Sequence, residues 1–356
     1  MRDRALHQRE RHGSIGPSLP SQHGPATADR WPGTGRILAA LVLSATVLLA
    51  MAPAPVAAQT EQRPIRLIYP FPAGSAGDTV SRIVADGLQA SLGRTVVVEN
   101  RSGAGGITGV RAVIAAEADG STLLISPTAP VVIIPAYNPS AGYQTETDLT
   151  PISHLVSQDL ALAVGPGLSA KNMAELLAEV RANPAKATYG TPGAGSSLHL
   201  MGVKLATQTG IKFTPVHYRG TSLALNDVVA GQLPMLFSAL PDQVEQHRAG
   251  NIRIIATSGR TRSTFVPEVP TFTEAGVDIA SVSWFAAYAP AGLAAKTAEQ
   301  LSAVMAQTVR RPENAKRLSD LGFIPVGSSP AELATLLKAE KSYWLPVIRE
   351  AGIKTP

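Results

Sequence analysis

Short apolar segments alternate with amphipathic segments along most of the chain. The segments 65–69, 95–99 and 122–125 have the length and the branched apolar composition of buried strands. Between the first two of them, the segment 78–91 places apolar residues at helical spacing. Three strand–helix units at this spacing predict a parallel, doubly wound sheet.

The same alternation continues in the middle of the chain, in the segments 160–164, 172–181, 188–191 and 196–208. The first and third of these read as strands, and the other two read as helices. The last part of the chain is predicted to be helical, over 297–310, 312–321 and 330–350.

The first 58 residues have the order of regions found in a secretory signal peptide. Residues 1–36 are polar and basic, residues 37–51 form an apolar run, and Val56-Ala57-Ala58 places small residues at a signal peptidase site. The run is short for a membrane span, and an uncleaved N-terminal anchor is the alternative. Without a cysteine there is no lipid attachment site. We therefore expect cleavage after Ala58 and a soluble periplasmic protein that is not a lipoprotein.

The composition excludes several classes of function. With no cysteine, the chain has no disulfide framework, thiolate metal site or thiol catalysis. Removal of residues 1–58 leaves 25 basic and 23 acidic side chains, and the aromatic content is 5%. This balance provides no basic, aromatic-rich face for nucleic acid and no basis for binding a membrane surface. The four histidines of residues 59–356 show no metal-ligand spacing, so we expect no metal and no cofactor.

Two segments share one design, in which a strand runs into a glycine-rich loop and then into a helix. They are Pro70–Asp78 and Gly193–His199. Such a junction directs unpaired N–H groups and the positive end of the helix dipole at one point. Ser75, Ser196 and Ser197 add hydroxyl donors. The pattern predicts an anion held from two sides, and the alternative is a pair of ordinary turns that bind nothing.

Three other features of the sequence point to chemistry less strongly. The segment Gly103–Gly109 fits the dinucleotide fingerprint poorly, because Thr108 stands at its third glycine position. Ser196 and His199 lack a nucleophile elbow and a nearby acid, which disfavours an exported hydrolase. Asp78 lies where a helix dipole favours a carboxylate, so it either orders its loop or contacts a ligand.

The chain resembles the substrate-binding receptors of tripartite tricarboxylate transporters, also called the Bug family. The resemblance covers nearly all of the chain after the signal peptide and runs through six motifs: Tyr69–Gly74, Val98–Gly106, Asp119–Leu124, Gly193–Leu200, Tyr218–Gly220 and Val269–Gly276. It implies an α/β protein of two lobes, each a doubly wound mixed sheet flanked by helices. It also implies a monomer that captures a small organic carboxylate and delivers it to two integral-membrane subunits, without catalysis. An extracytoplasmic sensor that feeds a signalling receptor is the alternative.

The resemblance assigns ligand-binding roles residue by residue. The first loop supplies Phe71, Ala73, Gly74, Ser75 and Asp78, with Thr128 after the third strand, and the second loop supplies Gly195, Ser196, Ser197 and His199. The variable side of the site is lined by Tyr218, Arg219, Gly220, Thr221, Ser238 and Asp242. Lobe 1 is expected to comprise 59–158 and 284–356, and lobe 2 to comprise 159–283. Ser75 replaces a glycine that is usual in the family, so the resemblance does not identify the carboxylate.

Overall fold

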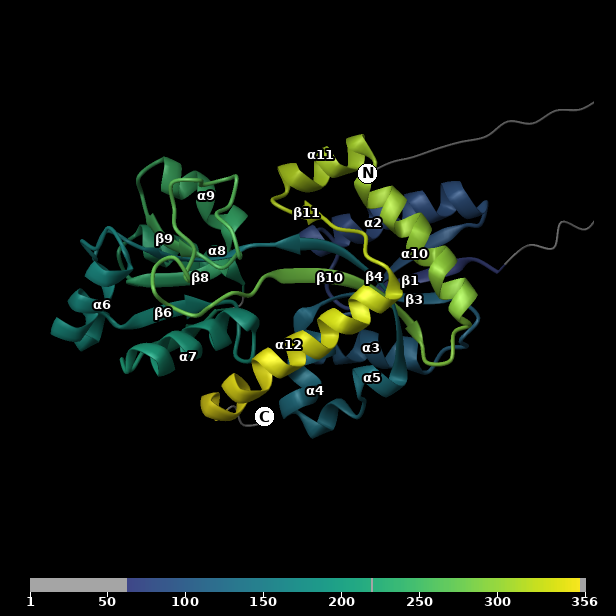
Figure 1. Cartoon of the computed structure of the whole chain (residues 1–356), viewed down its shortest axis with the longest axis horizontal. Coiled ribbons are helices and arrows are strands. Elements are labelled where there is room, and N and C mark those ends of the chain that lie inside the picture. Colours follow the sequence, from purple (N-terminus) through teal and green to yellow (C-terminus); the bar gives the residue numbers. More distant parts are fainter. Residues whose placement is uncertain (1–62, 219, 353–356) are drawn as a thin grey trace, which may run out of the picture. The chain divides into compact units, whose positions relative to one another are not determined.

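The strands divide between two sheets in the computed structural model, which describes residues 63–218 and 220–352 (Figure 1). The first sheet has the order β11-β4-β10-β3-β1-β2 and contains β1 (Ile65–Tyr69), β2 (Val96–Asn100), β3 (Thr122–Pro127), β4 (Leu149–Gln158), β10 (Ser283–Pro290) and β11 (Ile324–Pro325). The second has the order β7-β6-β8-β5-β9 and contains β5 (Leu160–Val164), β6 (Thr188–Thr191), β7 (Thr214–His217), β8 (Met235–Ala239) and β9 (Arg253–Thr257).

Both sheets are mixed. In the first, β1 pairs in parallel with β2 and β3, whereas β10 is antiparallel to β3 and β4. In the second, β6 is parallel to β7 and β8, whereas β5 is antiparallel to β8 and β9. The wholly parallel sheet predicted from the strand–helix units is correct for β1–β3 and wrong for the sheet as a whole. The mixed α/β architecture implied by the resemblance is confirmed.

Helices flank both sheets (Figure 1). Those that follow strands of the first sheet are α2 (Ala76–Leu92), α3 (Ile107–Ile114), α4 (Ile134–Tyr137), α5 (Thr145–Asp148), α10 (Ala295–Arg310), α11 (Pro312–Asp320) and α12 (Pro330–Ala351). Those that follow strands of the second sheet are α6 (Met173–Ala182), α7 (Ser197–Thr209), α8 (Thr221–Val229) and α9 (Leu240–Arg248). None of the described helices is long and apolar enough to cross a membrane.

The apolar face of α2 shows how the helices are fixed to the first sheet. Its side chains at Val80, Val84 and Leu88 are fully buried, and burial of each contributes roughly 1.5–3 kcal/mol. Gly87 lets α10 approach closely, because a Cβ atom at this position would lie 2.1 Å from the Thr308 hydroxyl. Close packing against α10 at Gly87 therefore holds α2 in place beside the first sheet.

Helix α12 contacts elements beside both sheets. It begins with a capping box, in which the Ser329 hydroxyl accepts from the Glu332 amide and the Glu332 carboxylate accepts from the Ser329 amide. Farther along, Trp344 is fully buried. The helix packs against β4 of the first sheet and against α7, which follows a strand of the second (Figure 1).

Two further points of the sequence analysis differ from the structure or lie outside it. The strands β4 and β10 were not predicted, because each pairs with a partner far away in the sequence and β4 carries Pro151 near its start. The signal peptide expected over residues 1–58 lies outside the described residues, and so does Arg219.

Candidate functional site

The junction between β1 and α2 is organised by Ser75. Its hydroxyl accepts a hydrogen bond from the Asp78 amide (3.3 Å) and lies 3.1 Å from the Tyr69 hydroxyl, to which it donates. Ser75 is thus the N-cap of α2, and its oxygen is occupied by the helix. The first two N–H groups of the helix, those of Ala76 and Gly77, have no acceptor within it. The junction therefore offers backbone donors at a helix N-terminus.

Asp78 orders the loop that precedes its own helix. Its buried carboxylate accepts from the Gly74 amide (3.0 Å), from Asn100 Nδ2 (2.9 Å) and from the Arg82 guanidinium (2.9 Å). Burial alone would raise the pKa of Asp78, but the hydrogen bonds from Asn100, Gly74 and Arg82 outweigh it and hold the pKa below its usual value. Asn100 also donates to the Phe71 carbonyl. Of the two roles open for Asp78, loop ordering is the one that these contacts support.

The junction between β6 and α7 repeats this design. The Ser196 hydroxyl accepts from the His199 amide (3.2 Å) and donates to the Gly193 carbonyl (2.8 Å), so Ser196 is the N-cap of α7. Ser197 is the first residue of the helix and is half-buried. The N–H groups of Ser197 and Leu198 have no acceptor within the helix. The two junctions therefore present equivalent sets of backbone donors.

His199 is a buried, neutral imidazole. Burial and the neighbouring His217 lower its pKa to about 4. Its Nδ1 atom accepts from the Gly195 amide (3.2 Å), which places the proton of the neutral ring on Nε2. The two imidazole rings pack edge to face at 4.8 Å, and the Thr191 hydroxyl lies 3.1 Å from His217 Nδ1. This cluster fixes the glycine loop and supplies an N–H donor beside it.

A side chain of α4, which follows a strand of the first sheet, reaches the glycine loop between β6 and α7. A Cβ atom at Gly195 would lie 2.6 Å from the hydroxyl of Tyr137 in α4, so this tyrosine packs directly against the Gly195 backbone. Toward the first loop, a Cβ atom at Gly106 would lie 2.7 Å from Pro130 and 3.4 Å from Phe71. Through Pro130 and the helical segment that continues to Tyr137, the structure brings the Phe71 loop and the Gly195 loop to one region.

The predicted residues that the structure describes lie at or just after the C-terminal ends of parallel strands. Those of the first sheet follow β1 and β3: Phe71, Ala73, Gly74, Ser75, Asp78 and Thr128. Those of the second follow β6, β7 and β8: Gly195, Ser196, Ser197, His199, Tyr218, Gly220, Thr221, Ser238 and Asp242. In an α/β sheet this edge is where ligands bind.

Individual side chains of this set differ in what they offer a ligand. Thr128 is 3% exposed, and its buried hydroxyl has no hydrogen-bond partner. Ser238 is fully buried, and its hydroxyl accepts from Gln243 Nε2 (2.7 Å). The Tyr218 hydroxyl donates to the Asp227 carboxylate (2.7 Å), and Asp242 is exposed in the first turn of α9. Of these four side chains, only Thr128 combines burial with an unused polar atom.

Two contributors were missed by the sequence analysis. Asn100, which bonds to Asp78, ends a strand parallel to β1, and the strand-end rule would have found it. Tyr137 lies in a four-residue helix that no periodicity predicts, so nothing in the sequence pointed to it. Among residues 63–218 and 220–352, no cluster of His, Asp or Glu side chains has the geometry of a metal site.

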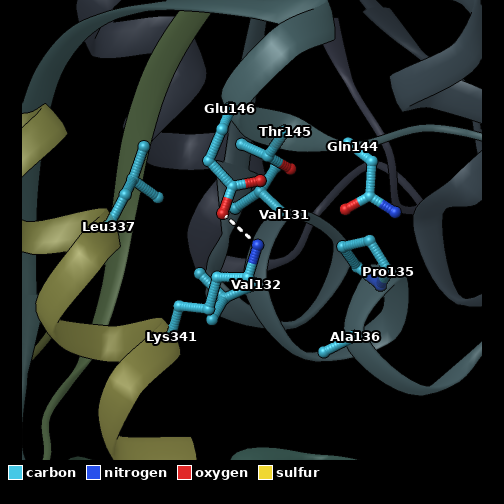
Figure 2. A pocket seen from close by; sticks show the side chains of 9 residues that line it. All are labelled: Val131, Val132, Pro135, Ala136, Gln144, Thr145, Glu146, Leu337 and Lys341. Carbon is cyan, nitrogen blue, oxygen red and sulfur yellow. Dashed lines mark hydrogen bonds and ion pairs between the residues drawn. The ribbon is translucent and has the colours of Figure 1, made fainter. Parts of the chain in front are cut away.

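A small cavity beside α12 is separate from this region. Figure 2 shows that Lys341 forms an ion pair with Glu146 across it, between walls that include Val132, Pro135 and Leu337. Its volume is about 20 Å³. A cavity of that size holds one water molecule, so it does not serve as an organic ligand site.

Comparison with known proteins gives consistent matches. The family model of the tripartite tricarboxylate transporter family receptor matches residues 80–353. Protein BugT of Bordetella pertussis is 34% identical over 304 residues, which cover 85% of this chain and 93% of BugT. An R. palustris protein solved with adipate has a TM-score of 0.71 at 29% identity, covering 82% of this chain and 98% of that one. MatC from Rhodopseudomonas palustris, solved with bound malate, has a TM-score of 0.69 at 27% identity, covering 83% of this chain and 100% of that one. The fold is that of two-lobed periplasmic binding proteins.

Proposed function

Because the chain belongs to the tripartite tricarboxylate transporter receptor family, we propose that it binds a small organic carboxylate and delivers it to a membrane transporter. The observation that carries this proposal is the matched pair of capped helix N-termini at Ser75 and Ser196. Each directs free backbone N–H groups and the positive end of a helix dipole toward the strand ends, where a carboxylate is stabilised. Two solved relatives with bound adipate and malate support this ligand class.

The ligand contacts proposed here are mostly backbone donors. Ser75 and Ser196 act as caps, so the carboxylate is held by the amides of the first helical turns, with Ser197 and the Nε2 proton of His199 as side-chain donors. Thr128 supplies one more hydroxyl, whose lack of a protein partner favours a ligand contact. Phe71, Ala73, Gly74 and Gly195 shape the loops. Tyr218, Gly220, Thr221, Ser238, Asp242 and Arg219 belong to the side that differs between relatives.

The mechanism proposed is closure of two lobes around the ligand. Lobe 1 comprises 59–158 and 284–356, and lobe 2 comprises 159–283, a division supported by the membership of the two sheets. Donors from both lobes reach the carboxylate only in the closed form, so ligand binding stabilises closure. We propose that the mature protein starts at Gln59, is a periplasmic monomer, and transfers its ligand to two membrane subunits.

We also propose that the protein is not an enzyme. The Ser196 hydroxyl is bonded to the Gly193 carbonyl and the His199 amide, and His199 Nδ1 is engaged by Gly195. A serine nucleophile would instead need an imidazole nitrogen as its base, held in turn by an acid. The hydrogen bonds of this serine therefore fit a helix cap better than a nucleophile.

Thermal unfolding against a panel of aliphatic and aromatic carboxylates tests the proposal. The exported protein is unfolded and refolded first, so that carried-over ligand is lost. A ligand present at about a thousand times its dissociation constant stabilises the fold by roughly 4 kcal/mol, which is a clear shift in Tm. Matched alcohols and primary amides serve as controls without the anionic group. Equal shifts with the carboxylates and with their amides would refute a carboxylate receptor.

A further inference from the structure

A cavity of about 700 Å³ lies where the chain passes between the two sheets. Its walls include Asp159, which joins β4 to β5, and the segment 280–282, which precedes β10. The loop 258–265 after β9 and residues of α12 and β11 complete it. No residue of the loops that follow β1, β3, β6, β7 or β8 lines it. This cavity is therefore distinct from the carboxylate site proposed above.

The cavity is lined by buried polar groups, one of which has no hydrogen-bond partner in the protein. Asp159 is 7% exposed, and burial raises the pKa of its carboxyl group, with the Ser263 hydroxyl acting in the opposite direction. Ser281 is 5% exposed, and its hydroxyl has no hydrogen-bond partner. Buried polar groups without partners are costly. A ligand that donates hydrogen bonds would satisfy the Ser281 hydroxyl and would add a second bond at the Asp159 carboxyl group, beside that from Ser263.

The charges around the cavity favour a cation. A second carboxyl group, that of Glu340, accepts from Trp344 Nε1 at 3.0 Å, and burial raises its pKa as well. The guanidinium of Arg262 is already paired with Glu274 (2.9 Å). The lining then contains two carboxyl groups and one further guanidinium, that of Arg260, whose charge acts to lower the pKa of Glu340. One added positive charge would balance the lining.

The other residues of the cavity wall indicate the polarity and size of the ligand. Phe265, Val282, Leu336 and the exposed Ile324 contribute apolar surface. The volume lies within the range of small-molecule sites, about 300–1,000 Å³. The cavity thus suits a molecule with an apolar body and one polar, positively charged end.

We propose that this cavity is a second binding site, which takes an organic monoamine with its ammonium group between Asp159 and Glu340. The ammonium donates to the Asp159 carboxylate and the Ser281 hydroxyl, whereas the apolar body lies against Phe265 and Ile324. The site requires neither the helix N-termini nor a bound carboxylate.

Tryptophan fluorescence provides a direct readout. The carboxylate of Glu340 faces the indoles of Trp344 and Trp284, and the chain has three tryptophans in all. Removal of residues 1–58 removes Trp31, so the fluorescence of the mature protein reports from Trp284 and Trp344 beside Glu340. Phenethylamine is titrated as the probe, and 2-phenylethanol, which has the same body without the charge, is the matched control. We expect a saturable change with the amine and at least tenfold weaker binding of the alcohol.

Charge-removing variants test the assignment. Asp159→Asn keeps the side-chain shape and should weaken phenethylamine binding at least tenfold, bringing it close to the alcohol. Glu245→Gln removes an exposed carboxylate in α9, outside the cavity, and should bind as the parent does. If Asp159→Asn does not fold, Glu340→Gln, followed by calorimetry, replaces it. Equal affinity for amine and alcohol, or unchanged amine affinity in the folded variants, would overturn the proposal.

Discussion

Replacement of Asp78 by alanine tests whether this carboxylate orders the first loop. The variant loses the bonds from Gly74 and Asn100, each worth about 1.5 kcal/mol at the lower end of the range for a charged acceptor. The bond from Arg82, whose side chain is 52% exposed, adds no more than about 0.5 kcal/mol. Loss of a negative charge at a helix N-terminus adds about 0.5 kcal/mol. Asp78→Ala should therefore lower the free energy of unfolding by about 4 kcal/mol.

Urea unfolding of the ligand-free protein, monitored by circular dichroism, measures this loss. Arg82→Ala is the matched control, since it removes only the exposed ion pair and should cost about 0.5 kcal/mol or less. The bonds from Gly74 and Asn100 are assigned most of the effect. A loss of unfolding free energy below about 1 kcal/mol for Asp78→Ala would therefore refute the reasoning. An equal loss for Arg82→Ala would also refute it.

The pH dependence gives an independent check of the same carboxylate. The pKa of Asp78 is held below its ordinary value of 3.8 in the folded protein. Its contribution to stability is therefore present above pH 3.8 and is lost as the pH falls through the lower, folded value. The difference in unfolding free energy between the parent and Asp78→Asn should narrow as the pH is lowered below 3.8. A difference that is constant down to the folded pKa would contradict the assigned pKa direction.

The second junction gives further predictions. Ser196→Ala removes a helix cap and should lower the free energy of unfolding in urea by about 1 kcal/mol. Ser197→Ala should change that free energy by no more than about 0.5 kcal/mol and should weaken carboxylate binding about tenfold in calorimetry. A reversed pattern would contradict the cap assignment. Gly195→Ala places a side chain at φ 72° and 2.6 Å from Tyr137, so it should cost at least about 1–2 kcal/mol, and Tyr137→Ala should recover part of that loss. His199 has a pKa of about 4 instead of 6.5, so the unfolding free energy should fall as the pH is lowered from 6.5 to 4, and His199→Gln should flatten that slope.

The sequence predicted the strand–helix units well because their information is local. The predicted strands 65–69, 160–164 and 188–191 coincide with β1, β5 and β6. The first two are short apolar runs, and all three end at a turn that contains glycine or proline. The predicted helix at 196–208 is shifted by one residue, because Ser196 caps it from outside. The junctions were found for the same reason, as glycine and serine mark them in the sequence.

The antiparallel strands and the side-chain roles were not accessible in this way. Pairing of β10 with β4 joins residues more than 120 positions apart, and no local pattern records it. Ser75 and Ser196 were predicted as ligand donors, yet each hydroxyl is occupied in capping its helix. Composition identifies a hydroxyl but not its acceptor, so only three-dimensional geometry separates a cap from a ligand contact.

The two chain connections between the sheets are where a movement of the lobes would have to occur. On the side of the second sheet, Leu160 and Ser281 are both tied to Ser258: the Leu160 amide donates to the Ser258 hydroxyl, and the Ser281 amide donates to the Ser258 carbonyl. On the side of the first sheet, Gln158 and Ser283 are paired as neighbours in β4 and β10.

Only one residue of each connection lies between these two fixed points, Asp159 in the first and Val282 in the second. We therefore expect the backbone dihedrals at these two positions to absorb closure, as hinge residues do. Both residues also line the cavity of about 700 Å³ that is proposed above as a second binding site. A molecule bound there would contact both Asp159 and Val282, so it would favour one angle between the lobes. It would therefore change the affinity of the protein for the carboxylate. The carboxylate would change the affinity for that molecule by the same factor.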